Sequence, residues 1–207
     1  MLDDSRIVGI ATSLMGDDFN YVASDGNYYS GDTQWHSDGW RGRGYLSVKM
    51  AFYLDPLTRD TGALRVIPGS HRYGDGYAES LQSKIGESEE VWGVPGKDVP
   101  DIAIESEPGD LLIFNHNIKH ASFGGGGRRR MFTVNFTQRY RDADISELRD
   151  LIGGQSRFWI DRIFDERLVR TAGPDRMRHL EQAWANDGHL AELSRQRRAE
   201  MEEPSRG

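Results

Sequence analysis

The residues with the clearest chemical potential are His36 and Asp38, which stand two positions apart in the segment Gln34-Trp35-His36-Ser37-Asp38. In an extended chain, residues i and i+2 point to the same side, so this imidazole and this carboxylate can bind one metal ion together. Two histidines and one carboxylate on one face of an octahedral iron(II) ion leave three positions open, an arrangement typical of non-haem iron oxygenases. The motif therefore predicts two ligands of such a site and requires one more histidine from a distant strand.

Five further histidines are candidates for the third ligand, namely His71, His116, His120, His179 and His189. The last two fall in a predicted helical tail, where we expect His179 among Arg and Glu on a solvated face. His71 follows a Pro-Gly-Ser turn, and we expect it to serve structure rather than chemistry. His116 and His120 both come directly after a predicted strand, and strand periodicity leaves the choice between them open.

The chain before residue 142 has the pattern of a β-rich protein. Short segments rich in apolar, aromatic and β-branched residues alternate with turn signals such as Pro68-Gly69 and Pro108-Gly109, as expected for a sandwich or barrel. The predicted strands are residues 44–54, 64–67, 102–104, 110–114 and 131–136. The glycine run at 124–127 is predicted to be a flexible loop between the last two strands.

After residue 142 the apolar spacing becomes helical. Helices are indicated around residues 145–152 and 158–164, and Pro174 suits the first turn of a third. We expect residues 1–207 to form a single domain, in which a β core of residues 1–141 precedes a helical cover of residues 142–207.

Three segments, in this order, resemble the phytanoyl-CoA dioxygenase family of iron(II)/2-oxoglutarate oxygenases. The first is Trp35-His36-Ser37-Asp38, and the second is Gly62-Ala63-Leu64-Arg65-Val66-Ile67-Pro68-Gly69-Ser70-His71. The third is Pro108-Gly109-Asp110-Leu111-Leu112-Ile113-Phe114, followed by His120-Ala121-Ser122 and then by arginine. The resemblance implies a mainly β fold with α, namely a double-stranded β-helix (jelly-roll) core with flanking C-terminal helices.

The resemblance also implies a complete site. His120 becomes the third iron ligand beside His36 and Asp38, and an arginine about ten residues further on binds the far carboxylate of 2-oxoglutarate. The competing arginines are Arg128, Arg129 and Arg130. Strand alternation does not separate them, but the family-like register favours Arg129, with Arg130 second. A planar guanidinium suits bidentate binding of a carboxylate.

Lys49 and a pair of tyrosines are further candidates for cofactor binding. Lys49 interrupts an apolar strand, and it either reaches the cavity to meet an anionic group of cosubstrate or substrate or faces solvent. The Tyr28-Tyr29 pair could contribute phenols to the 2-oxoglutarate site. Together with Arg41 and Arg43, Lys49 favours an anionic or polar substrate.

By this resemblance we expect an enzyme that binds Fe(II), uses 2-oxoglutarate as cosubstrate together with dioxygen, and acts on a small molecule. It would hydroxylate an unactivated C–H bond and form succinate and carbon dioxide. Related halogenases replace the carboxylate ligand with a small residue, so the presence of Asp38 favours hydroxylation. Desaturation, ring closure and epoxidation are left open, because they depend on how the substrate is placed.

Three alternative hypotheses belong to other classes. A 2-oxoglutarate-independent, cupin-like metalloprotein would share the fold and the metal but would not need the arginine after His120. A non-catalytic binding relative would keep the fold without turnover. A zinc hydrolase can use two histidines and one carboxylate, but it would want an additional general base, for which the sequence has no clear motif.

The composition limits the choice of partners. A formal net charge of −7 and only local arginine clusters give no basic face for nucleic acid. The absence of cysteine excludes disulfides and thiolate metal sites. No apolar run approaches the length of a membrane span, and the N-terminus lacks a signal-peptide pattern, so we expect a cytoplasmic protein without membrane association. A homodimer through the C-terminal helices is left open.

Overall fold

The computed structural model describes residues 1–39, 44–127 and 129–205. Backbone proximity divides the chain into two compact units. Unit 1 comprises Met1–Ser24, Gly44–Leu46 and Val134–Gly207, and unit 2 comprises Asp25–Arg43 and Ser47–Thr133. These boundaries differ from the predicted division at residue 142, because the N-terminal segment groups with the C-terminal helices. That the chain forms a single domain stays a prediction.

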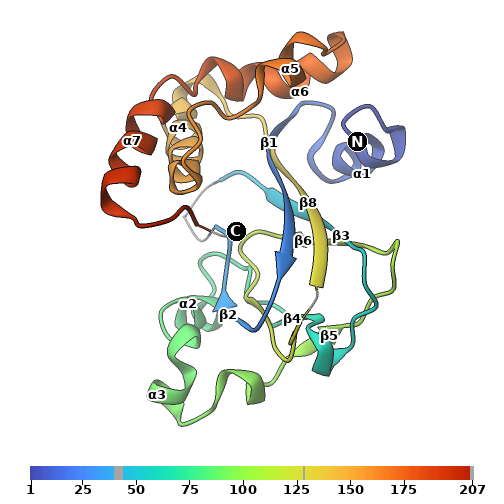
Figure 1. Cartoon of the computed structure of the whole chain (residues 1–207), viewed down its shortest axis with the longest axis vertical. Coiled ribbons are helices and arrows are strands. Elements are labelled where there is room, and N and C mark those ends of the chain that lie inside the picture. Colours follow the sequence, from blue (N-terminus) through green and yellow to red (C-terminus); the bar gives the residue numbers. More distant parts are fainter. Residues whose placement is uncertain (40–43, 128, 206–207) are drawn as a thin grey trace. The chain divides into compact units, whose positions relative to one another are not determined.

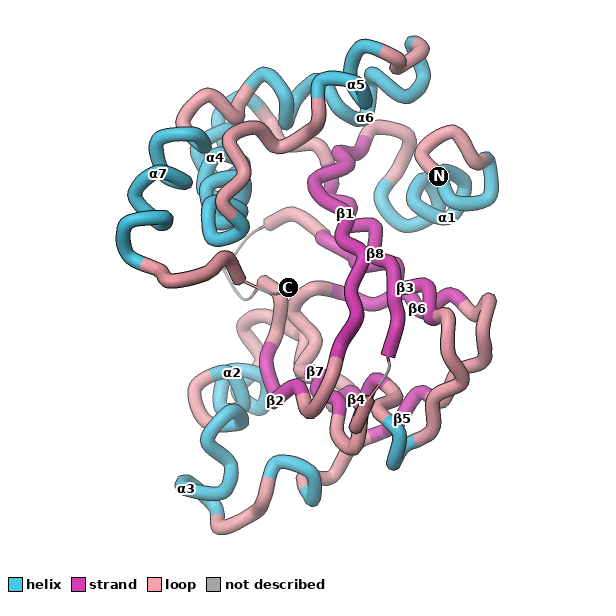
Figure 2. The backbone as a smooth tube through the Cα atoms, in the orientation of Figure 1, coloured by secondary structure: helices cyan, strands magenta, loops and turns pink. Residues whose placement is uncertain are grey.

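The strands of the described chain are β1 (Phe19–Tyr29), β2 (Thr33–His36), β3 (Ser47–Tyr53), β4 (Leu64–Val66), β5 (Ile102–Ile104), β6 (Leu111–Asn115), β7 (His120–Ser122) and β8 (Arg129–Gln138). They form one sheet of order β1-β8-β3-β6 and a second of order β2-β7-β4-β5 (Figure 1 and Figure 2). The predicted jelly-roll core is thereby confirmed. Each predicted strand is present within a few residues, whereas β1, β2 and β7 are not among the predicted strands.

The strand β3 carries side chains toward the interior of unit 2. It pairs with β6 in antiparallel fashion, with Lys49 opposite Phe114. Since side chains alternate along a strand, Lys49, Ala51 and Tyr53 share one face of β3. Ala51 and Tyr53 belong to a buried apolar cluster with side chains of β4 and β6. Lys49 therefore lies on the face of β3 that is turned to the core.

Short helices interrupt the part of unit 2 that was predicted to be β-rich. They are α2 (Gly76–Gln82) and α3 (Ser88–Trp92), with the 3-10 turns η1 (Arg59–Thr61), η2 (Ile85–Glu87) and η3 (Gly96–Asp98). Leu81 of α2 and Ile85 of η2 pack with Trp35 and Phe123 in a second buried cluster. Because helical periodicity is recognised over windows of about 11–18 residues, elements this short leave no clear pattern in the sequence.

Unit 1 is mainly helical. Its helices are α1 (Ser5–Met15), α4 (Ile145–Gly153), α5 (Glu166–Arg170), α6 (Pro174–Ala185) and α7 (Leu190–Glu200), with the 3-10 turns η4 (Asp142–Asp144) and η5 (Gly154–Phe158). The first and third predicted helices are confirmed as α4 and α6, the latter starting at Pro174. The helix predicted at 158–164 is wrong, because η5 ends at Phe158 and irregular chain follows.

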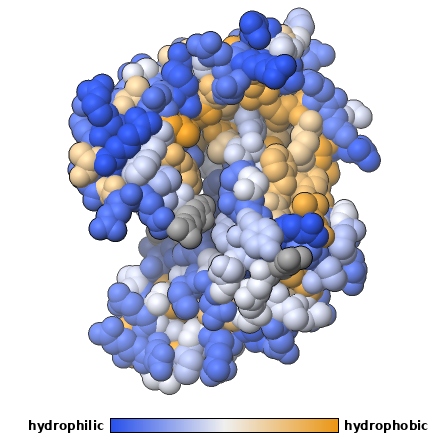
Figure 3. Space-filling view, in the orientation of Figure 1, coloured by the Kyte–Doolittle hydropathy of each residue, from blue (hydrophilic) through white to orange (hydrophobic). Residues whose placement is uncertain are grey.

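Charged residues cover the helix α7 at the surface of unit 1, and aromatic rings pack in its core. Figure 3 shows a largely hydrophilic surface over α7. On this helix Arg195 forms an ion pair with Glu192, and Arg197 forms one with Glu200. His179 of α6 is buried and stacks on Phe19 with ring centroids 3.8 Å apart, so the prediction of a solvated His179 is wrong. No helix within the described ranges combines the length and the apolarity needed to cross a bilayer.

A buried ion pair ties η1 to β4 in unit 2. Asp101 has a fully buried carboxylate, which accepts two hydrogen bonds from Arg59 at 2.6 and 2.9 Å. Arg65 of β4 lies 3.5 Å from the same carboxylate and is itself 4% exposed. Removing one partner of such a buried network leaves an uncompensated charge away from water.

We therefore expect Asp101→Ala to lower the free energy of unfolding by about 3–5 kcal/mol. Glu90, an exposed carboxylate on α3 of the same unit, is the matched control, and Glu90→Ala should change stability by less than about 0.5 kcal/mol. Chemical denaturation followed by circular dichroism measures both. Equal stability of the two variants would contradict a stabilising role for the Asp101 network.

Candidate metal centre and cosubstrate site

His36, Asp38 and His120 are brought together at one end of unit 2. His36 ends β2, His120 begins β7, and the two strands pair in antiparallel fashion with these two histidines opposite each other. One potential ligand atom from each of the three side chains lies within 4.8 Å of those of the other two. Strand pairing thus places His120 beside the His-x-Asp motif, where it could serve as the distant histidine that the motif needs.

Both histidines are oriented by backbone carbonyls. Nδ1 of His36 lies 2.7 Å from the Gln34 carbonyl oxygen, and Nδ1 of His120 lies 2.9 Å from that of Ile118. Because a carbonyl can only accept, each Nδ1 is the donor, and in the neutral ring Nε2 keeps its lone pair. Burial lowers the pKa of His120 to about 4. Its Nε2, 3.7 Å from Oδ2 of Asp38, is therefore free of a proton at neutral pH.

Asp38 is ionised and paired with Lys49. Its side chain is 18% exposed, and its Oδ2 lies 2.8 Å from Nζ of Lys49. Burial opposes ionisation of this carboxyl, but the charge of Lys49 outweighs burial, with help in acid from the protonated ring of His120, and lowers the pKa of Asp38 below its usual range. Lys49 therefore lies inside the site and not in solvent, and its immediate partner is the carboxylate of the metal motif.

Arg129 is the buried arginine of the glycine-rich region. It is 4% exposed, donates to the Gly62 carbonyl at 3.0 Å and to Oγ1 of Thr33 at 3.1 Å, and lies 4.9 Å from the centre of the Tyr29 ring. Its Nε is buried without a hydrogen-bond partner in the described part of the chain. Burial lowers the pKa of Arg129, although the guanidinium remains charged at neutral pH.

Arg130 points elsewhere. Its side chain is 53% exposed and pairs with Asp55 at 2.7 Å. This placement disfavours Arg130, the second candidate for 2-oxoglutarate, and leaves Arg129 as the better one. Arg128 lies outside the described residues, as do Arg41 and Arg43.

Two tyrosines surround Arg129, and only one of them was singled out in the sequence. Tyr29 lies beneath the guanidinium, whereas Tyr28 is 59% exposed. Tyr53, from the interior face of β3, is buried, and burial raises its pKa to about 12, so its phenol keeps its proton. In the sequence, the one sign that Tyr53 belongs to this site is its position four residues after Lys49, on the same face of the strand.

The remaining histidines do not join the metal centre. Nδ1 of His179 lies 2.9 Å from the Phe19 carbonyl oxygen in unit 1, and Nε2 of His189 lies 2.9 Å from that of Arg149. The carbonyl of His116 accepts from the Gly39 amide at 3.2 Å, next to the motif, so His116 is a neighbour of the site. His71 is not part of the three-residue cluster.

The glycine run forms a loop, as predicted, and its first residues are hydrogen-bonded to neighbouring segments, while its flexibility stays a prediction. The Gly124 amide donates to Asp32 at 2.7 Å, and the Gly125 carbonyl accepts from Gly31 at 3.1 Å. Gly124 has a φ of +77°, and a Cβ there would lie 2.3 Å from the Asp60 carbonyl oxygen. The glycines therefore allow three stretches of backbone to approach closely beside Arg129.

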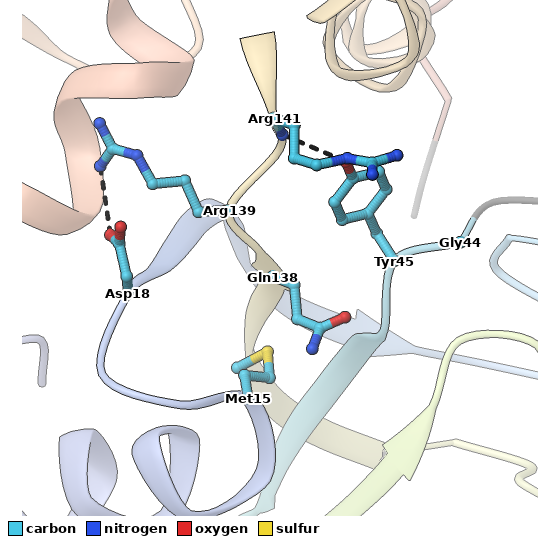
Figure 4. Close-up of a pocket in the computed structure, with 7 residues that line it drawn as sticks. All are labelled: Met15, Asp18, Gly44, Tyr45, Gln138, Arg139 and Arg141. Carbon is cyan, nitrogen blue, oxygen red and sulfur yellow. Dashed lines mark hydrogen bonds and ion pairs between the residues drawn. The ribbon is translucent and has the colours of Figure 1, made fainter. Parts of the chain in front are cut away.

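A separate cleft of about 390 Å³ lies in unit 1, lined among others by Tyr45, Gln138, Arg139 and Arg141 (Figure 4). Arg139 pairs with Asp18 and Glu181 at 3.3 and 2.9 Å, and Arg141 pairs with Asp144 at 2.7 Å. Because both cations have carboxylate partners, this cleft gives no specific indication of a ligand.

Comparison with known proteins identifies the family of the chain. Residues 11–131 match the family described as Phytanoyl-CoA dioxygenase (PhyH). Ectoine dioxygenase from Sphingopyxis alaskensis is 28% identical over 148 residues, which cover 58% of this chain and 46% of that protein. The chain thus spans about half the length of this curated relative.

Solved structures of similar fold include EvdMO1, with a TM-score of 0.50 and 19% identity over 68% of this chain and 32% of that one. They also include EctD from S. alaskensis with 2-oxoglutarate and 5-hydroxyectoine, with a TM-score of 0.47 and 26% identity over 65% of this chain and 50% of that one. The first of these supports the fold alone.

The packing of the glycine run generates a test. We expect Gly124→Ala to destabilise the protein by more than about 1 kcal/mol, since it adds a left-handed backbone penalty to a clash with Asp60. Gly126→Ala is the matched control, because a Cβ at Gly126 would meet nothing within 4 Å. Thermal unfolding of both variants measures the difference. A Gly124→Ala protein as stable as its control would show that the loop does not depend on this close approach.

Proposed function

Because this chain belongs to the phytanoyl-CoA dioxygenase family, we propose that it is an iron(II)- and 2-oxoglutarate-dependent oxygenase acting on a small molecule. The observation that carries the proposal is the cluster of His36, Asp38 and His120. The dioxygenase relative, of which this chain spans about half, supports the same class of activity.

The donor set fits ferrous iron. Two neutral imidazoles offer Nε2, and one ionised carboxylate offers oxygen, which is the combination used for iron(II) on one octahedral face. Backbone carbonyls hold Nδ1 of His36 and His120, so neither ring is free to rotate away. When bound, the metal would supply the redox chemistry with dioxygen, while the protein holds the ligands and orients the substrate.

Arg129 fits the far carboxylate of 2-oxoglutarate. It is a cation in an apolar and aromatic environment, and its direct hydrogen bonds go to the carbonyl of Gly62 and the hydroxyl of Thr33. A buried charge without a directly bonded counter-charge is costly, and a bound carboxylate would relieve that cost. This feature distinguishes the proposal from a cupin-like metalloprotein, which has no need for such an arginine.

Hydroxylation of an unactivated C–H bond, with formation of succinate and carbon dioxide, is the reaction we propose. Asp38 occupies the carboxylate position, so the position that a halide would need at the metal is taken. The substrate itself is proposed only as a small molecule.

The first test is anaerobic visible absorption of the protein with iron(II), before and after addition of 2-oxoglutarate. We expect a weak metal-to-ligand charge-transfer band, absent in His120→Ala. Arg129→Leu should weaken 2-oxoglutarate binding by about 2–5 kcal/mol, or ~30-fold and more in Kd, because it removes a buried partner of the carboxylate. The exposed Arg130→Leu serves as control and should leave the Kd unchanged.

Each outcome has a distinct meaning. Iron binding without the band would favour a metalloprotein that does not use 2-oxoglutarate. Absence of iron binding would favour a non-catalytic relative. An effect of Arg130→Leu equal to that of Arg129→Leu would contradict the assignment of the arginine.

A further inference from the structure

Lys49 occupies an unusual position for a cation in a metal site. Its Nζ is 2.8 Å from Oδ2 of Asp38, while Nε2 of His36 and His120 lie 3.9 and 3.7 Å from the oxygens of the same carboxylate. The Lys49 side chain is 18% exposed, and its Nζ lies 6.0 Å from the centre of the Phe114 ring. The ammonium is therefore held in the interior and competes for the ligand that a metal ion needs.

The net charge near the ligands rises when a metal ion binds. Lys49 and Asp38 neutralise each other in the metal-free site. A divalent ion held by two neutral imidazoles and one carboxylate leaves one positive charge, and Lys49 adds a second close by. Such a site opposes the metal alone and favours the metal together with an anion.

The strand that carries Lys49 also leads to Arg129. Lys49 and Tyr53 are four residues apart on the same face of β3, and Tyr53 lies near Arg129, whose positive charge opposes the rise in the pKa of this phenol. Two cations thus flank one interior face, one beside the metal ligands and one beside Tyr53. A dicarboxylate has one anionic group for each of them.

We propose that Lys49 couples metal binding to 2-oxoglutarate binding, by pairing with Asp38 in the metal-free site and with the cosubstrate's metal-proximal carboxylate in the loaded site. The inference rests on the proposed function. Coupling of this kind is reciprocal, so the cosubstrate strengthens metal binding by the same factor by which the metal strengthens cosubstrate binding. Lys49 is a positioning residue in this scheme and takes no part in bond making.

The test measures the Kd of Mn²⁺ with and without saturating 2-oxoglutarate, from the electron paramagnetic resonance signal of free Mn²⁺. In the wild-type protein, 2-oxoglutarate should tighten Mn²⁺ binding by about tenfold or more. In Lys49→Met, Mn²⁺ alone should bind about tenfold more tightly, since its competitor is gone, and the enhancement by 2-oxoglutarate should fall below about threefold. Lys49→Arg, which keeps the charge, should retain most of the coupling.

Arg130→Met is the matched control, because it removes a cation that pairs with Asp55 outside the site, and it should behave as wild type. Lys49→Gln serves as a second neutral variant should Lys49→Met fail to fold, as judged by circular dichroism. Unchanged Mn²⁺ affinity and coupling in the neutral variants would overturn the inference while leaving the proposed function intact. Weaker Mn²⁺ binding in both conditions would also overturn it, because Lys49 would then merely orient Asp38. Failure of the wild-type protein to bind Mn²⁺ would overturn the proposed function itself.

Discussion

The pairing of β2 with β7 is the constraint on which the site depends. Thr33 stands opposite Ser122 and His36 opposite His120, so the register shifts by one residue between these two pairs. Without that irregularity, Trp35 would stand opposite His120, and every side chain after Thr33 would turn to the other face. The shift lets Trp35 enter the apolar cluster with Phe123 while His36 faces Asp38 and His120. This local irregularity thus brings the histidines of the candidate metal centre opposite each other.

Two buried arginines of unit 2, Arg65 and Arg129, differ in whether a carboxylate of the protein neutralises their charge. Arg65 has the buried carboxylate of Asp101 as its partner and belongs to the framework. Arg129 is equally buried, but its hydrogen bonds go to a carbonyl and a hydroxyl, and Asp32 acts on it only through space. The same contrast separates Arg129 from Arg130, which Asp55 satisfies at the surface. The arginine without a directly bonded counter-ion is the one suited to receive a ligand carboxylate.

The local parts of the site are predictable from sequence, and the rest is not, for physical reasons. His36 and Asp38 follow from the two-residue period of extended chain, whereas His120 and Arg129 needed the family resemblance, because strand pairing and burial leave no local pattern. The pair of Lys49 with Asp38 depends on the close approach of β3 to the metal motif, so alternation alone left Lys49 between solvent and cavity. His179 was predicted to be solvated because its sequence neighbours are charged. Its stacking on Phe19 joins residues far apart in the chain, which local sequence does not reveal.

The segment from Gly62 to Ser70 connects the two ends of the site, which gives a physical reason for its resemblance to the family pattern. The Gly62 carbonyl accepts from Arg129 and from Ser122, and its φ of +102° favours glycine. At the other end, Val66 stands opposite His120, and Oγ of Ser70 accepts from the Lys119 amide at 2.8 Å. One short stretch therefore orients both Arg129 and His120. A distortion of β4 should therefore shift Arg129 and His120 together.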